Sequence, residues 1–254
     1  MSDPRDGSAW VTGASSGIGE ALALRLARDG WTVHASARSA ERLKALEGRA
    51  ADLPGRIVAA PCDVTDLEAV KATVAAIEGQ GPLALAILNA GTYVPDRAKD
   101  FDSGGFEKTI GVNVLGTAKC LEALMPAWAA RRRGHLAIVA SVAGYGGLPT
   151  AMAYGASKAA LINFAEGLKF DFDRLGLKIQ LIDPGFVRTP LTDKNRFRMP
   201  ALMEVDDAVE RIVRGLRSDA FEITFPKRFT YLVKLLRFLP YRLYFPLVRK
   251  ATKS

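Results

Sequence analysis

The chain has 254 residues, of which 49% are hydrophobic and 24% charged, enough for one large α/β domain or two small domains with a buried core. The net charge of +8 lies entirely in the last 28 residues, which carry eight basic and no acidic side chains, so a basic nucleic-acid-binding domain is disfavoured. The two cysteines lie far apart and the two histidines have no companion ligands, which argues against a disulfide framework and a metal site.

The N-terminus is polar and leads directly into a strand-like segment, without the apolar core of a secretory signal, so we expect a cytoplasmic protein. Apolar runs then alternate with helical periodicity as far as about residue 226. Strands are expected at Ser8–Thr12, Thr32–Ala37, Arg56–Pro61, Leu83–Asn89, His135–Ser141 and Lys178–Asp183. This alternation predicts an α/β fold, a Rossmann-like doubly wound parallel sheet with helices on both faces, in one domain over residues 1–226 with a tail at 227–254.

The glycine-rich segment from Thr12 to Gly19 lies between the first strand and the first helix. Glycines there allow the backbone to approach a pyrophosphate, and the helix N-terminus offers free N–H groups. Residues 13–17 also match the G-x-S-x-G nucleophile elbow of α/β-hydrolases, with Ser15 as the nucleophile. A hydrolase is disfavoured because Ser15 follows the first strand and the last histidine, His135, lies too early for a triad.

The end of the second strand bears on the choice of dinucleotide. NAD-preferring sites place a carboxylate there for the ribose 2′-hydroxyl, whereas this chain has Ala37 followed by Arg38. A guanidinium at that place favours a 2′-phosphate and therefore NADP(H) over NAD(H). The alternative is that Arg38 is a solvated residue at the start of a helix.

The strongest chemical signal is Tyr154 with Lys158, preceded by Ser141 at the end of a strand. Positions i and i+4 share one face of a helix, so Lys158 is expected beside Tyr154 and to lower the tyrosine pKa towards working pH. Ser141 is expected at the carboxyl edge of the sheet, where it can hydrogen-bond a substrate oxygen.

In this order and spacing the motifs resemble the short-chain dehydrogenase/reductase family. The resemblance extends from about Ala9 to about Pro226, with one small departure at Leu88, where many members have a second asparagine. It rests on the following residues: T-G-x-x-x-G-I-G at Thr12–Gly19, Asp63-Val64, Asn89-Ala90-Gly91, Asn113, Ser141, Tyr154, Lys158, Pro184-Gly185, Val187 and Thr189.

That resemblance implies a catalytic set made of Asn113, Ser141, Tyr154 and Lys158, with Asn113 positioning a water in a proton relay through Lys158. It also implies these cofactor contacts: Gly13, Ser15, Ser16, Ile18 and Gly19 at the pyrophosphate; Arg38 at the 2′-phosphate; Asp63 and Val64 at the adenine; Asn89, Ala90 and Gly91 as support; Tyr154 and Lys158 at the ribose; Pro184, Gly185, Val187 and Thr189 at the nicotinamide. The implied activity is hydride transfer between NADP(H) and a ketone or secondary alcohol, in a homo-oligomer (dimer or tetramer). The alternative is a non-catalytic dinucleotide-binding sensor on the same fold.

Two segments outside these motifs carry further expectations. Residues 191–208, including Arg196, Phe197 and Arg198, are expected to form a substrate lid or an ordinary mobile loop. In the tail, Lys227, Thr230, Lys234 and Arg237 are predicted on one helical face, with Phe229, Leu232, Val233, Leu236 and Leu239 opposite, and Pro240 and Pro246 are expected to break any long helix. The basic and aromatic tail predicts contact with an anionic membrane surface without crossing it, and hints at a lipid-like substrate. The alternative is that the tail packs on the domain itself or on a dimer partner.

Overall fold

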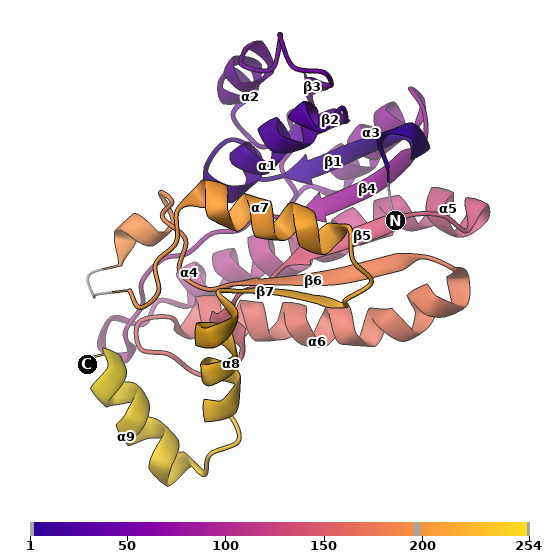
Figure 1. Cartoon of the computed structure of the whole chain (residues 1–254). Helices are drawn as coiled ribbons and strands as arrows, with labels where there is room; N and C mark the ends of the chain where they lie inside the picture. The colour runs from indigo at the N-terminus through magenta and orange to yellow at the C-terminus, as the bar shows by residue number, and fades with distance from the viewer. Residues whose placement is uncertain (1–2, 196–198, 253–254) are drawn as a thin grey trace.

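A computed structural model of the chain describes residues 3–195 and 199–252. Its centre is a sheet of seven parallel strands in the order β3-β2-β1-β4-β5-β6-β7 (Figure 1). The strands are β1 (Ser8–Thr12), β2 (Thr32–Ser36), β3 (Arg56–Ala59), β4 (Leu83–Leu88), β5 (His135–Val139), β6 (Lys178–Pro184) and β7 (Glu222–Phe225).

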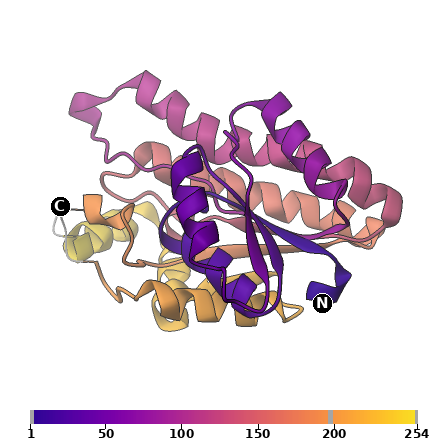
Figure 2. The same ribbon diagram turned by 90° about the horizontal axis from the view of Figure 1, so that it is seen from above.

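Helices cover both faces of this sheet, as Figure 2 shows from above. The helices are α1 (Gly17–Arg28), α2 (Ala40–Gly48), α3 (Leu67–Glu78), α4 (Ser103–Ile110), α5 (Gly116–Arg131), α6 (Met152–Leu175), α7 (Val205–Leu216), α8 (Lys227–Leu236) and α9 (Tyr241–Thr252). One apolar core packs α1, α2 and α7 on the sheet, and a second packs α3, α5 and α6 on the opposite face. The predicted doubly wound α/β fold is confirmed.

The six predicted strands are present with ends that differ by at most two residues, but β7 was not predicted. This strand has four residues, pairs in parallel with β6 at Ile182↔Ile223, and is followed at once by Pro226. A run this short cannot show a clear period, so its strand identity comes from its neighbour in the sheet.

The strand order reverses between β1 and β4, which are direct neighbours with Trp10 opposite Ala86. In an open α/β sheet, ligands bind at such a switch point, outside the carboxyl ends of the strands. Thr12, Asn89, Ser141 and Pro184 all lie at or directly after these ends, on four different strands. The topology thus gathers the predicted motifs at one edge of the sheet.

The tail forms two helices, α8 and α9, that extend beyond the sheet at the same end (Figure 1). Thr230 is fully buried, Lys234 pairs with Glu222, and Arg237 Nη1 donates to the Tyr145 carbonyl at 2.9 Å. Three of the four residues predicted on the basic face therefore contact the domain, whereas Lys227 is exposed. Pro240 separates the two helices, but α9 continues through Pro246.

Within the described residues, no helix combines the length and the apolar character that crossing a membrane would need.

Candidate active site

The glycine turn after β1 is closed by the end of β4. Gly13 has φ +67°, and a Cβ there would lie 2.8 Å from Ala90 Cα, so only glycine fits. At Gly19 a Cβ would lie 2.4 Å from the Gly13 carbonyl oxygen and 2.5 Å from Asn89 Nδ2. Asn89 Nδ2 itself donates to the Thr12 carbonyl at 3.1 Å. The turn is thus held open for a ligand by close packing beneath it, in which Asn89 and Gly19 take part.

Thr12 is a structural residue of the site for which the sequence motifs predicted no separate role. Its Oγ1 accepts from the backbone N–H groups of Asn89 and Ala90, both at 3.0 Å, and the side chain is 1% exposed. The hydroxyl therefore joins the carboxyl ends of β1 and β4 at the switch point. Its position as the last residue of an apolar strand is the sequence feature that could have predicted this role.

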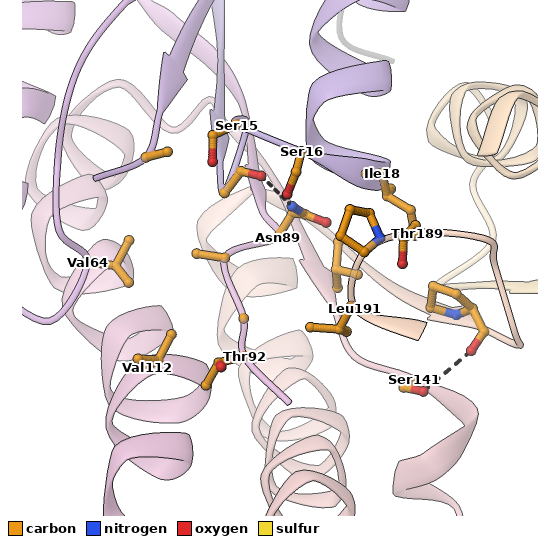
Figure 3. A pocket seen from close by; sticks show the side chains of 18 of the residues that line it. Ser15, Ser16, Ile18, Val64, Asn89, Thr92, Val112, Ser141, Thr189 and Leu191 are labelled. Atoms are coloured by element: carbon orange, nitrogen blue, oxygen red, sulfur yellow. Dashed lines mark hydrogen bonds between the residues drawn. The ribbon is translucent and has the colours of Figure 1, made fainter. Parts of the chain in front are cut away.

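A cavity of about 440 Å³ extends along this edge of the sheet (Figure 3). Ser15, Ser16 and Ile18 lie on one side of it, with Val64, Val112, Thr189 and Leu191 around the rest. The predicted residues that line it are Gly13, Ser15, Ser16, Ile18, Arg38, Asp63, Val64, Asn89, Ala90, Gly91, Ser141, Tyr154, Lys158, Pro184, Gly185, Val187 and Thr189. Gly19 and Asn113 do not line it.

Several residues that were not predicted from the sequence also line this cavity. They are Gly17, Ala37, Ser39, Arg42, Cys62, Thr92, Lys108, Val112, Val139, Ala140 and Pro190. Ser39 caps α2, where its Oγ accepts from the Arg42 N–H at 3.3 Å. Arg38 lies directly before this cap and Arg42 lies in the first turn of α2, so two arginines close in sequence line the cavity. No histidine is among the described lining residues, which agrees with rejecting the hydrolase.

Asp63, expected at the adenine, lines the cavity. Its carboxylate hydrogen-bonds Thr65, two residues further along the chain. Asp63 Oδ1 accepts from the Thr65 N–H at 2.9 Å and from Thr65 Oγ1 at 2.8 Å. The backbone hydrogen bond from Thr65 is the main cause that lowers the pKa of Asp63. The carboxylate is therefore charged at neutral pH and fixed in orientation.

The three reactive side chains come together from β5 and α6. Ser141 follows β5, and its Oγ accepts from the Ala143 N–H at 3.1 Å. Lys158 is 3% exposed, and its Nζ donates to the Val139 carbonyl at 2.8 Å and lies 5.5 Å from the centre of the Tyr154 ring. The Tyr93 ring meets the Tyr154 ring edge to face at 5.1 Å. The predicted neighbours are thus neighbours in space, and Tyr93 is an additional contact.

The lowered pKa expected for Tyr154 is wrong for this structure. Burial raises the pKa of Tyr154 to about 12, and a hydrogen bond with Ser141 opposes this only in part. Burial likewise lowers the pKa of Lys158 to about 8. Desolvation disfavours the charged form of each side chain and is the main cause of both shifts. Tyr154 is therefore a protonated group at neutral pH, which suits a proton donor.

Asn113 lies in a π-helical turn, Gly111–Leu115, between α4 and α5. Its Oδ1 accepts from the Thr92 N–H at 2.7 Å, and its Nδ2 donates to the Thr92 carbonyl at 3.1 Å and to Ser157 Oγ at 2.9 Å. A Cβ added to Gly91 would lie 3.4 Å from Asn113 Oδ1 and 3.7 Å from Lys158 Nζ. Asn113 is thus close to Lys158, and its side chain is held by these three hydrogen bonds inside the protein.

A buried carboxyl cluster behind the site was not predicted. Tyr145 Oη lies 3.0 Å from Asp183 Oδ2 and 2.7 Å from Glu222 Oε1, and Lys234 pairs with Glu222 from the tail. Asp183 is fully buried and its Oδ1 has no hydrogen-bond partner, so burial raises its pKa. The cluster links α8 to the residue directly before Pro184, which lines the cavity.

A second cavity of about 1110 Å³ is lined by Tyr93, whose ring packs on that of Tyr154 in the first cavity. Thr92 and Ser141 line the first cavity, and their neighbours Tyr93 and Val142 line the second. Most of its other walls come from the 94–109 segment, the predicted lid and the tail: Val94, Pro95, Phe106, Asp193, Lys194, Asn195, Pro200, Phe229, Leu232, Val233, Leu236, Tyr244 and Val248. The contribution of the tail to this cavity was not predicted.

The predicted lid is a loop only in part. Leu191 and Thr192 line the first cavity, and Lys194 Nζ donates to the Tyr93 carbonyl at 2.7 Å. Residues 205–208 belong to α7, because helical hydrogen bonding begins there. Arg196, Phe197 and Arg198 lie outside the described residues.

Comparison with known proteins agrees with this geometry. Residues 8–199 match the short chain dehydrogenase family, and the chain belongs to this family of oxidoreductases. An uncharacterized oxidoreductase from Myxococcus xanthus is 40% identical over 235 residues, covering 92% of each chain, and one from Staphylococcus epidermidis is 31% identical over 85% of this chain and 93% of its own.

Solved structures give the same result. A short-chain dehydrogenase from Sphingobium yanoikuyae in complex with NADPH is 26% identical, with a TM-score of 0.80 over 89% of this chain and 91% of that one. A short chain dehydrogenase from Burkholderia cenocepacia in complex with NADP is 24% identical, with a TM-score of 0.83 over 97% of this chain and 99% of that one, and shows the fold.

Proposed function

We propose that the protein is an NADP(H)-dependent oxidoreductase that interconverts a ketone and a secondary alcohol. The observation that carries this proposal is that Ser141, Tyr154 and Lys158 line the same cavity as the glycine turn. When bound, the dinucleotide supplies or accepts the hydride. Substrate binding and proton transfer are carried out by side chains of this protein.

In the reducing direction, Ser141 and Tyr154 hydrogen-bond the carbonyl oxygen of the substrate and Tyr154 Oη gives its proton to that oxygen. With a pKa of about 12, Tyr154 carries this proton at neutral pH. The Lys158 ammonium binds ribose hydroxyls and stabilises the phenolate left behind. Asn113, beside Gly91 and Lys158, is proposed to hold a water that returns a proton to this pair.

The preference for NADP(H) is proposed from the end of the first cavity near β2. Arg38 and Arg42 line it, and no carboxylate stands at Ala37. Two guanidinium groups suit a 2′-phosphate, which they can bind through charge-assisted hydrogen bonds. The NADPH bound to the Sphingobium relative is consistent with this choice.

The substrate is proposed to be hydrophobic. The second cavity, of about 1110 Å³, is larger than a short ketone needs, and its walls are mainly aliphatic and aromatic. Six charged residues also line it, and one of them, Asp96, is held by the N–H groups of Met152 and Ala153, which donate to its carboxylate at 2.8 Å. The aliphatic and aromatic walls would hold the apolar body of the substrate.

A homo-oligomer, dimer or tetramer, is also proposed, since members of this family are generally oligomeric. Light scattering coupled to size-exclusion chromatography measures this directly, and a monomer at micromolar concentration would contradict it.

The competing function is a dinucleotide sensor without catalysis. A sensor has no need for a proton donor, yet the site combines Ser141, Tyr154 and Lys158. The test is NADPH oxidation by purified protein with ketones that range from acetone to long-chain acyl ketones. We expect turnover that improves with chain length; tight NADPH binding without turnover of any ketone would favour the sensor.

A further inference from the structure

The tail helices α8 and α9 have two different surfaces. Their inner side lines the second cavity through Phe229, Val233, Leu236 and Tyr244, and their outer side faces away from the domain. Eight of the thirteen large hydrophobic side chains exposed in the described part of the chain lie between Tyr231 and Leu247. A monomeric protein rarely leaves so many apolar side chains together in water.

We call the exposed side chains Leu235, Phe238, Tyr241, Leu243 and Phe245 the outer tail surface. Phe238 is 84% exposed and Tyr241 is 76% exposed, and the Tyr241 and Phe245 rings stack at 5.5 Å. None of the five lines either cavity. Their exposure is therefore not explained by substrate binding.

Exposed basic side chains lie on the same two helices as this surface. Arg228, Arg242, Arg249 and Lys250 are exposed and form no ion pair within residues 3–195 and 199–252. Residues 227–254 contain no acidic side chain. A partner for this surface must therefore offer both apolar contacts and negative charge.

We infer that the outer tail surface docks the protein on an anionic lipid bilayer. Aromatic side chains at the level of the head groups and flanking cations are the features that hold peripheral proteins on such bilayers. A second copy of this chain is a poorer fit, because a two-fold contact would place the same uncompensated cations opposite each other. The bilayer would then be the source of the hydrophobic substrate proposed above, because α8 and α9, the docked helices, also line the second cavity. Only this last step rests on the proposed function.

Co-sedimentation of the full chain with vesicles tests the docking. Vesicles of phosphatidylcholine and phosphatidylserine at 7:3 are compared with phosphatidylcholine alone, at 50 mM and 500 mM NaCl. We expect binding to the anionic vesicles at low salt and at least tenfold weaker partitioning to neutral vesicles or at high salt.

Two double variants with matched controls separate apolar from electrostatic contributions. Phe238→Ser with Tyr241→Ser is compared with Phe170→Ser, which changes an aromatic that is 71% exposed on α6. Arg249→Glu with Lys250→Glu is compared with Arg28→Glu with Arg214→Glu, which changes the net charge equally on α1 and α7. Each tail variant is expected to lose at least tenfold in partitioning, and each control less than twofold.

Two results would overturn the inference: wild-type protein that stays in the supernatant with anionic vesicles at low salt, or tail variants that bind as well as their controls. A tail variant that changes the oligomeric state while vesicle binding persists would assign the surface to a second copy. NADPH oxidation with the ketone panel, measured on the same preparations without vesicles, tests the proposed function separately. Activity without docking refutes only the docking, and docking without turnover of any ketone of the panel refutes only the oxidoreductase.

Discussion

The burial of Lys158 predicts how NADPH affinity depends on pH. Burial lowers the pKa of Lys158 to about 8, below the value of about 10.4 for a free lysine side chain. A group with a lowered pKa of this kind is charged below that pH and neutral above it. Because the ammonium is proposed to bind ribose hydroxyls, NADPH affinity should be near its maximum at pH 7. It should fall by up to about tenfold per unit above pH 8, or roughly 30-fold by pH 9.5.

Fluorescence titration of NADPH between pH 7 and pH 10 measures this profile. Tyr154→Phe keeps the lysine and should show the same profile, which separates the two groups. Lys158→Arg keeps a charge throughout and should show a flat one. A wild-type dissociation constant that changes less than twofold across this range would refute the reasoning, as would a profile that disappears in Tyr154→Phe.

Three further predictions follow from single contacts. Arg38→Asp should weaken or reverse the preference for NADPH over NADH by removing a cation and adding repulsion to the 2′-phosphate; equal use of both dinucleotides by wild-type protein would contradict the role of Arg38. Gly19→Ala should cost about 1–3 kcal/mol in the free energy of unfolding and abolish NADPH binding, because the new Cβ would lie 2.4 Å from the Gly13 carbonyl oxygen. Gly48→Ala on α2 is the control, since it has open space around it and should be tolerated. Denaturant melts compare the two variants. Lys234→Met should lower the free energy of unfolding by about 1–3 kcal/mol, because Glu222 is left half-buried beside Asp183 without its cation. Lys44→Met breaks the exposed pair with Glu47 and should cost under about 1 kcal/mol. Equal effects of both variants in thermal unfolding would show that the carboxyl cluster does not hold the tail.

Local patterns made much of the fold and site predictable. The alternation of apolar runs and helical periodicity located six of seven strands, and residues with defined spacing, such as Tyr154 and Lys158, lie on one helix. Residues that directly follow a strand, such as Ser141, could be assigned to the carboxyl edge of the sheet because parallel strands all end at that edge.

What could not be predicted depends on contacts between distant segments. Tyr145, Glu222 and Lys234 gain their significance only when β7 and α8 bring them together around Asp183. The pKa of Tyr154 depends on its desolvation, which a sequence does not show. The tail pattern gave the right composition but the wrong face, since helical periodicity states which residues share a side and not which side meets the domain.

The central claim, that Tyr154 is the proton donor in hydride transfer to a ketone, is tested most directly by Tyr154→Phe. The substitution removes one hydroxyl and leaves the ring that packs against Tyr93 at 5.1 Å. With saturating NADPH and the best ketone from the substrate panel, we predict that kcat falls by about 10² or more while the NADPH dissociation constant stays within threefold of wild type. A kcat within threefold of wild type would contradict the assignment.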